Sequence, residues 1–298
     1  MAGIVTSTGR LNGRPAAGGT FSRARVLHER PRMKRLLLCL AITLPLAAQD
    51  NGLFPRFSVI GGYAPADFET NARIDPEIAG GEGTLVGFER DLGLDDQRTL
   101  HRLNVQWRPF ARHELSATYF TAPRRGLEQI TRNITFRDEV YPVDALVSTQ
   151  FDFDYASLTY TWWARRSDRD GLGISLGVAH LALDAALTYS RPGTSVTVTQ
   201  TADTEAPILL GGLQGRVAFT DRIHGEASVA TLPRVTIEDY TGRALTGMAR
   251  LEYRPVRWLG VGAAYQYFNL DIDVAQPTLT GSLDMTIRGP EAYVRLAF

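Results

Sequence analysis

The chain ends in a strongly sided segment, Gly289-Pro290-Glu291-Ala292-Tyr293-Val294-Arg295-Leu296-Ala297-Phe298. Counted back from Phe298, alternate positions hold Leu296, Val294 and Ala292, while Arg295 and Glu291 lie between them. Successive side chains of a β-strand point to opposite faces of the sheet. The segment is therefore predicted to be a strand with one apolar face and one face that carries charge.

A terminal strand of this kind, with an aromatic last residue, resembles the end of a bacterial outer-membrane β-barrel protein. The resemblance implies that Phe298, Leu296 and Val294 form the signal read by the barrel-insertion machinery. The alternation itself allows a second interpretation, an edge strand of a soluble sheet. The rest of the chain has to decide between them.

The composition gives no electrostatic indication of a partner. The chain has 298 residues, with 32 Lys and Arg against 32 Asp and Glu. A balanced charge creates no overall field that would attract nucleic acid. Beyond residue 48 no apolar run reaches about 18 residues, so a helical membrane protein is excluded.

The amino-terminal region is predicted to be removed from the mature protein. Met33-Lys34-Arg35 precedes an apolar run over 36–46, and Ala47-Ala48 follow it, a pattern typical of a secretory signal with cleavage after Ala48. A buried helix is the alternative. Residues 1–32 are rich in Gly, Arg and Ala and are expected to be a mis-called start or a disordered extension. Because Cys39 lies in the signal, the mature chain, 49–298, is expected to contain no thiol or disulfide.

Alternation recurs along the mature chain. In 99–108, for example, Leu103, Val105 and Trp107 alternate with polar residues. A transmembrane β-strand needs only about 9 to 11 residues, with lipid-facing apolar positions between lumen-facing polar ones. The predicted strands are 56–65, 99–108, 114–121, 151–165, a strand beginning at 172, 208–220, 223–238, 243–254, 258–271 and 282–298.

The lengths of the connections indicate the topology. Short turns are predicted at 109–112, 166–170, 220–222 and 255–257, and longer connections lie between them, including 191–206. Outer-membrane barrels have short periplasmic turns and long external loops. We therefore predict an all-β, antiparallel, up-and-down transmembrane barrel of about ten strands with both termini on the periplasmic side. If the strand-like piece 84–92 also crosses, the number becomes about twelve, and if an early strand does not cross, about eight.

Aromatic residues near strand ends favour this barrel over a soluble, lipocalin-like one. Trp162-Trp163, beside Arg165-Arg166, is predicted to lie in an interfacial girdle. A soluble barrel would instead place its charges outward and its apolar residues inward. Periodicity alone does not separate the two arrangements.

If the apolar face of the terminal strand meets lipid, charged residues face the lumen. The same rule on the other strands gives eight lumen residues: Arg102, Glu114, Arg216, Glu226, Arg250, Glu252, Glu291 and Arg295. A barrel of about ten strands is little wider than the eight-stranded barrels that side chains fill. The predicted lumen is therefore plugged by an Arg/Glu network. An exposed ion pair contributes about 0 to 1 kcal/mol, but an unpaired buried charge costs several kcal/mol.

The mature chain offers little catalytic chemistry. Its four histidines, His101, His113, His180 and His224, lie on different strands or turns, and no phosphate loop, paired-His motif or Ca²⁺ loop is present. We therefore expect no cofactor, no metal and no enzymatic activity. The leading hypothesis is a structural or small-molecule-binding role. A narrow channel for a small or apolar solute and an envelope-lipid hydrolase using His101 or His180 are the alternatives.

Four further segments are similar to phrases found in poorly characterised proteobacterial outer-membrane β-barrel proteins. They are 88–94 (FERDLGL), 108–115 (RPFARHEL), 251–255 (LEYRP) and 265–270 (YQYFNL). The resemblance implies fold and outer-membrane location, with membrane lipids and lipopolysaccharide as surroundings. It implies no catalytic residues, and the sequence leaves the oligomeric state open.

Overall fold

The computed structural model describes residues 52–76, 83–136, 139–190, 197–237, 239–276 and 279–298. The predicted extension over 1–32 and the predicted signal over 33–48 lie outside these ranges, as does the cleavage site. Those three assignments stay predictions.

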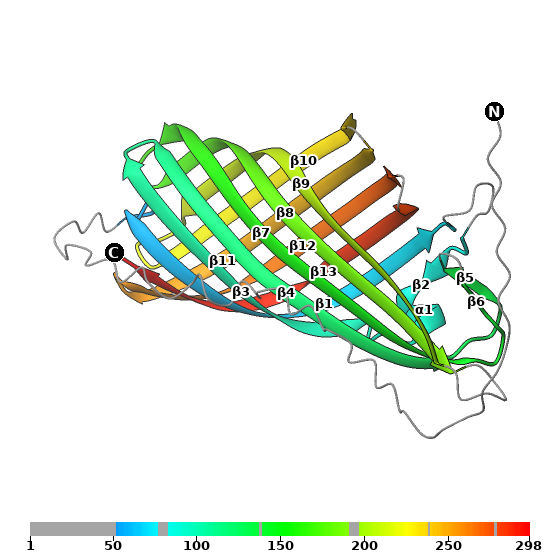
Figure 1. Ribbon diagram of the computed structural model, residues 1–298. Helices are drawn as coiled ribbons and strands as arrows, with labels where there is room; N and C mark the ends of the chain where they lie inside the picture. Colours follow the sequence, from blue (N-terminus) through cyan, green and yellow to red (C-terminus); the bar gives the residue numbers. More distant parts are fainter. Residues whose placement is uncertain (1–51, 77–82, 137–138, 191–196, 238, 277–278) are drawn as a thin grey trace, which may run out of the picture. The chain divides into compact units, whose positions relative to one another are not determined.

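Ten long strands form a closed antiparallel ring (Figure 1). The sheet has eleven strands, of which the two-residue β2 (Val86–Gly87) is attached to β1. The ring consists of β1 (Phe57–Ile74), β3 (Gln97–Phe110), β4 (His113–Gln129), β7 (Leu146–Arg166), β8 (Asp170–Ser190), β9 (Thr197–Ala218), β10 (Ile223–Ile237), β11 (Tyr240–Val256), β12 (Leu259–Gln276) and β13 (Leu279–Ala297). Each strand pairs with the next, which confirms the predicted all-β, up-and-down barrel.

The terminal strand closes the ring. β13 pairs with β1 from Ser58↔Ala297 to Ile74↔Gly281. At the very end, the Phe57 amide donates to the Phe298 carbonyl at 3.0 Å and the Phe298 amide donates back to the Phe57 carbonyl at 2.8 Å. A sheet closed in this way leaves no edge strand at the seam.

Short connections join β3 to β4, β7 to β8, β9 to β10 and β11 to β12 at one end of the barrel, as predicted. We call this the turn end and the opposite end the loop end. Several strands continue further toward the loop end than predicted: β1 runs past Pro65 to Ile74 and β4 past Thr121 to Gln129. The predicted connection 191–206 is wrong from Thr197 onward, because β9 begins there and pairs along the length of β8.

The strand-like piece predicted over 84–92 is also wrong. It forms β2 followed by a short helix, α1 (Phe88–Leu92). Phe88 and Leu92 lie one helical turn apart and both are buried, and the helix ends at Gly93, whose φ of 63° suits a glycine C-cap. A two-stranded hairpin, β5 (Ile134–Phe136) and β6 (Glu139–Tyr141), lies outside the ring sheet. Across the described ranges, no helix has the length and apolar character needed to cross a membrane.

The two faces of each strand exchange polarity along the barrel. At the turn end of β8, the exposed positions are Leu172, Ile174, Leu176 and Val178. Toward the loop end the same face carries the exposed His180 and Asp184, and the other face buries Leu181 and Leu183. The predicted rule of apolar outside and charged inside therefore holds only in the turn-end part.

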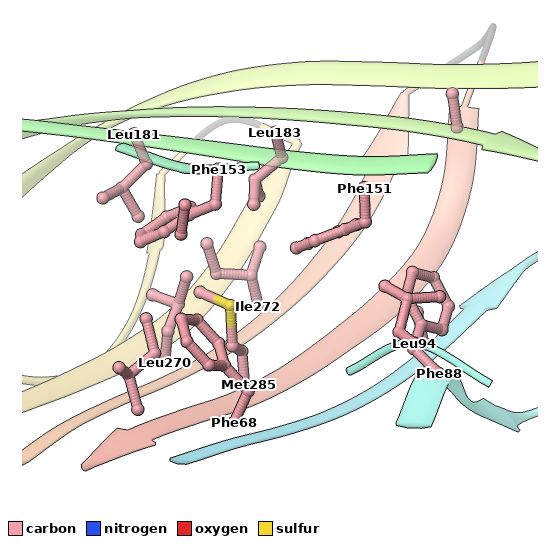
Figure 2. Packing of buried hydrophobic residues seen from close by; sticks show 14 of the residues in the cluster. Phe68, Phe88, Leu94, Phe151, Phe153, Leu181, Leu183, Leu270, Ile272 and Met285 are labelled. Atoms are coloured by element: carbon pink, nitrogen blue, oxygen red, sulfur yellow. The ribbon is translucent and has the colours of Figure 1, made fainter. Parts of the chain in front are cut away.

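A continuous apolar core fills the loop-end part. Figure 2 shows side chains from strands on different sides of the ring, such as Leu183 on β8 and Ile272 on β12, pointing toward one another. Phe88 and Leu94, from the segment around α1, belong to the same cluster. With polar residues outward and apolar residues inward, this part packs like a soluble barrel, whereas the turn-end part has the sidedness expected in lipid.

Candidate functional site inside the barrel

The structure places all eight predicted lumen residues on inward-facing positions of the turn-end part. Seven of them are buried, and the side chain of Arg102 is 12% exposed. They come from six strands, since Arg250 and Glu252 are both on β11 and Glu291 and Arg295 are both on β13. We call these residues, together with Arg254, the charge cluster.

Arg216 on β9 is held by two carboxylates. Its Nη1 and Nη2 donate to Glu114 on β4 at 2.8 and 2.7 Å, a bidentate pair. Its Nε lies 3.3 Å from the Glu226 carboxylate on β10. Bidentate pairs combine strength with a fixed geometry, so Arg216 joins strands from different sides of the ring across the lumen.

Glu226 is the centre of the charge cluster. One carboxylate oxygen, Oε2, lies 3.3 Å from Arg216, 3.3 Å from Arg295 and 3.8 Å from Arg250. Arg295 also reaches Glu252 at 3.1 Å. Three cations converge on one buried carboxylate, so removing Glu226 would take the carboxylate away from Arg250, while Arg216 would keep Glu114 and Arg295 would keep Glu252.

Arg102 and Glu291 form a second pair within the charge cluster. An Arg102 nitrogen lies 2.8 and 2.9 Å from the two Glu291 oxygens. Gly62 makes room for this pair, because a Cβ there would lie 2.2 Å from Glu291 Oε1. The Met248 sulfur contacts both Arg102 and Arg250, at 3.3 and 2.9 Å, and so connects this pair to the Glu226 group.

Sequence reasoning missed Arg254. Its Nε lies 2.5 Å from Glu252 and its Nη1 donates to the Gly52 carbonyl at 3.0 Å. The alternation Arg250, Glu252, Arg254 on β11 would have placed it on the same inward face. Its position beside the predicted turn at 255–257 obscured that signal.

An apolar plug lies against the charge cluster. Leu53 and Phe54 precede β1 and are buried with Trp163. The Phe54 and Trp163 rings meet edge to face at 4.8 Å, and the Arg216 guanidinium lies 4.6 Å from the Trp163 ring. Trp163 is therefore not in the predicted girdle: it faces the lumen with no exposed surface, and only Trp162 points outward, 41% exposed.

The lumen narrows to almost nothing at the charge cluster. The cavity among its side chains measures about 10 Å³, about the least that holds one water molecule. Toward the loop end, a chamber of about 140 Å³ borders the charge cluster at Glu226 and Arg250, and its lining combines polar side chains such as Asn104 and Gln214 with apolar ones such as Phe268. Charged side chains and the apolar plug together fill the cross-section between this chamber and the turn end.

The structure does not bring the four histidines together. His224 is buried beside the charge cluster, and His113 contacts the Tyr160 hydroxyl at 2.7 Å. The His101 ring lies 5.9 Å from that of Tyr63, and His180 lies 3.9 Å from Glu205. Within the described ranges, no group of three His, Cys, Asp or Glu side chains has an arrangement that would hold a metal ion.

The predicted signal residues lie on the outward face of the closing strand. Phe298, Leu296 and Val294 are 48%, 39% and 47% exposed, whereas Arg295 and Glu291 point inward. The Phe298 ring lies 6.4 Å from that of Phe57 across the seam. That these residues act as an insertion signal stays a prediction.

No family model and no curated protein matches the sequence. Among solved structures, the outer membrane protease OmpT from Escherichia coli is similar with a TM-score of 0.54 and 9% identity, covering 81% of this chain and 96% of that chain. The toluene transporter TodX of P. putida scores 0.35 at 8% identity, covering 81% and 90%. Ail, the attachment invasion locus protein of Yersinia pestis, scores 0.27 at 13% identity, covering 80% and 97%.

At 9% identity, the similarity to OmpT shows the fold alone. The closed ring, its seam and this similarity define the class: the chain has the fold of an outer-membrane β-barrel protein.

Proposed function

We propose that the protein is an outer-membrane barrel closed to solutes at its periplasmic end, with a structural or small-molecule-binding role. The observation that carries this proposal is the charge cluster. Its side chains and the plug of Leu53, Phe54 and Trp163 leave a cavity of about 10 Å³ at that level. A general porin needs a continuous aqueous path through the same region.

Liposome swelling tests the proposal. The purified barrel, reconstituted into phospholipid vesicles, is diluted into iso-osmotic monosaccharide beside a general porin reconstituted at the same molar ratio. We expect swelling at the rate of protein-free vesicles. Swelling at the rate of the porin would show that the lumen is open.

Orientation and partners follow from the same proposal. The short turns and both termini would lie on the periplasmic side, the turn-end part would meet lipid, and lipopolysaccharide would surround its outer rim. The insertion machinery would read Phe298, Leu296 and Val294. Phe298→Ala should reduce the amount of folded barrel in the outer membrane while refolding into detergent micelles stays efficient.

Phe110→Ala is the matched control for the insertion signal. Phe110 is an exposed, outward-facing phenylalanine at the end of another strand, 69% exposed against 48% for Phe298. We expect this variant to assemble at the wild-type level. Equal losses in both variants, or none in Phe298→Ala, would show that the terminal residue is not a signal.

We also propose that the role is not enzymatic, because the four histidines contact different partners and are not brought together. His180 and Glu205 are outward-facing and 3.9 Å apart, which makes this pair the one to test. The purified protein should release no fatty acid from lipopolysaccharide. Release that is lost in His180→Ala would identify an envelope-lipid hydrolase.

A further inference from the structure

The wall of the barrel is interrupted between β9 and β10. The ladder between these strands runs from His224↔Ala218 to Thr231↔Gly211 and ends there. β9 continues toward the loop end paired with β8, and β10 continues paired with β11. In Figure 1 the two strands run apart beyond this point. Pro207 follows on β9, and a bulge between Leu232 and Val235 follows on β10.

A comparable interruption on another side of the ring is filled. The β3–β4 ladder ends at Leu103↔Tyr119. Beyond it, β2 pairs with β1, and Leu94 forms a bridge with Gly126 of β4. The buried Arg124 reaches Glu89 of α1 and the Thr70 hydroxyl of β1. This segment of the chain therefore takes the place of the missing ladder.

The interruption between β9 and β10 holds a cavity instead. A cleft of about 370 Å³ is lined by Val178, Ala206, Pro207, Ile208, Leu209, Leu232, Val235, Gly242, Arg243, Leu270 and Ile272. That volume is within the range of about 300 to 1,000 Å³ of ligand pockets. We call it the lateral cleft.

The lateral cleft is lined by residues of both faces of the wall. Leu209 and Val178 belong to the outward face and are 56% and 43% exposed. Ile208, Leu270 and Ile272 belong to the inner apolar core and are buried. Because one cavity contacts both sets, an apolar group in it meets side chains of the outward face and of the inner core.

The level of the lateral cleft indicates what occupies it. On β8 and β9 the outward apolar band includes Val178 and Leu209, which pair with one another, and the exposed His180 and Glu205 lie just beyond them. In an outer-membrane barrel this level meets the acyl chains of the outer leaflet close to the headgroups. The exposed Arg243 lines the cleft at that level and is paired with Asp271 at 3.1 Å.

We propose that the lateral cleft takes an acyl chain of an outer-leaflet lipid through the barrel wall into the loop-end core. The apolar lining holds the chain, and Arg243 lies where the lipid's phosphate would sit. This proposal rests on the membrane placement proposed above and gives the barrel a defined lipid-binding site. Closure of the periplasmic end is independent of it.

Photo-crosslinking tests the proposal. The barrel is reconstituted in vesicles of phosphatidylcholine that carries an alkyl diazirine near the end of one acyl chain, irradiated, and mapped by mass spectrometry. We expect adducts on the inward-facing Ile208, Leu232 and Ile272 as well as on outward residues such as Leu176. Adducts confined to outward residues would overturn the lateral cleft as a site. An absence of adducts on Leu176 would instead overturn the membrane placement.

A matched pair of substitutions on β10 completes the test. Val235→Trp places a larger side chain in the lateral cleft, and Val229→Trp places the same side chain on the outward face of the intact ladder. We expect Val235→Trp to lower the yield of inward adducts at least fivefold and Val229→Trp to leave it unchanged. Equal yields in both variants would contradict entry through the lateral cleft. Far-ultraviolet circular dichroism and the gel shift on heating confirm that both variants fold.

Discussion

Arg216 and Glu114 are 102 residues apart in sequence and form a buried bidentate ion pair inside the barrel, with N–O distances of 2.8 and 2.7 Å. Removing one partner of a buried pair leaves an uncompensated charge and costs about 3–5 kcal/mol. Arg216→Met should therefore lower the free energy of unfolding by about that amount, measured by urea titration in lipid vesicles.

The exposed pair Arg165–Asp170, at a turn, is the control for this prediction. Its side chains are 72% and 40% exposed and lie 2.7 Å apart. A surface pair contributes only about 0 to 1 kcal/mol, so Arg165→Met should change the stability little. Equal losses of unfolding free energy in the two arginine variants would show that the lumen pair stabilises the fold no more than a surface pair does.

The exchange of polarity along the strands predicts that the cost of an outward charge depends on its position. Leu176 in the turn-end part and Leu127 in the loop-end part are similarly exposed, 63% and 62%. A lipid-facing arginine costs about 2–4 kcal/mol at the bilayer midplane and about 0–1 near the interface. Leu176→Arg should thus destabilise the reconstituted barrel far more than Leu127→Arg. Similar unfolding free energies for both would place the bilayer elsewhere.

The apolar plug predicts that adding a side chain at Gly171 destabilises the barrel. A Cβ on Gly171 would lie 2.3 Å from the Phe54 ring, whereas a Cβ on Gly211 meets no atom within 4 Å. Overpacking a filled site typically costs about 1–3 kcal/mol, so Gly171→Ala should destabilise the barrel by that amount and weaken the near-ultraviolet signal of its tryptophans. Gly211→Ala is the control, and a neutral result for Gly171→Ala would mean that Phe54 does not pack there.

Asp91 makes the packing of α1 dependent on pH. Burial raises the pKa of the Asp91 carboxyl, but hydrogen bonds from Arg90, from the Gly87 amide and from Arg132 outweigh burial and hold the pKa below its ordinary value of 3.8. A group with a lowered folded pKa stabilises the fold above its unfolded pKa, and this contribution is lost as pH falls through the folded value. Amide exchange over residues 83–94 should therefore accelerate, after correction for intrinsic rates, below about pH 4.

Asp91→Asn should remove most of that pH dependence and raise exchange at neutral pH. Asp95→Asn, at an exposed position four residues along the chain, is the control and should behave like the wild type. If the exchange profile of the wild type stays flat between about pH 6 and pH 3, the Asp91 contacts do not stabilise α1.

The barrel and its inward charges could be predicted because both depend on a two-residue period. The alternation of Val294, Arg295 and Leu296 gives the side of each residue, and the same phase places Arg216 and Glu114 inward. Which carboxylate each arginine binds depends on the relative positions of strands across the lumen. No local pattern encodes that arrangement.

The predictions that were wrong failed because a local sequence pattern did not specify the three-dimensional surroundings of the residues. Tryptophan is a residue type typical of an interfacial girdle, but Trp163 directly follows Trp162 in the strand and so points to the opposite face. The α1 segment is only five residues long, and Phe88 and Leu92 alone do not distinguish a helical period from alternation. In the loop-end part apolar and polar residues still alternate, but the apolar residues now point inward and the polar residues outward. There, apolar side chains such as Leu183 pack against the core and do not contact lipid.

The closed lumen is tested most directly by the conductance of single barrels in a planar bilayer in concentrated potassium chloride. With Arg216, Glu226 and their partners filling the cross-section, we expect no stable conductance steps from barrels whose insertion is verified by the gel shift on heating. Steady, voltage-independent open-channel steps from the wild-type protein would contradict the account.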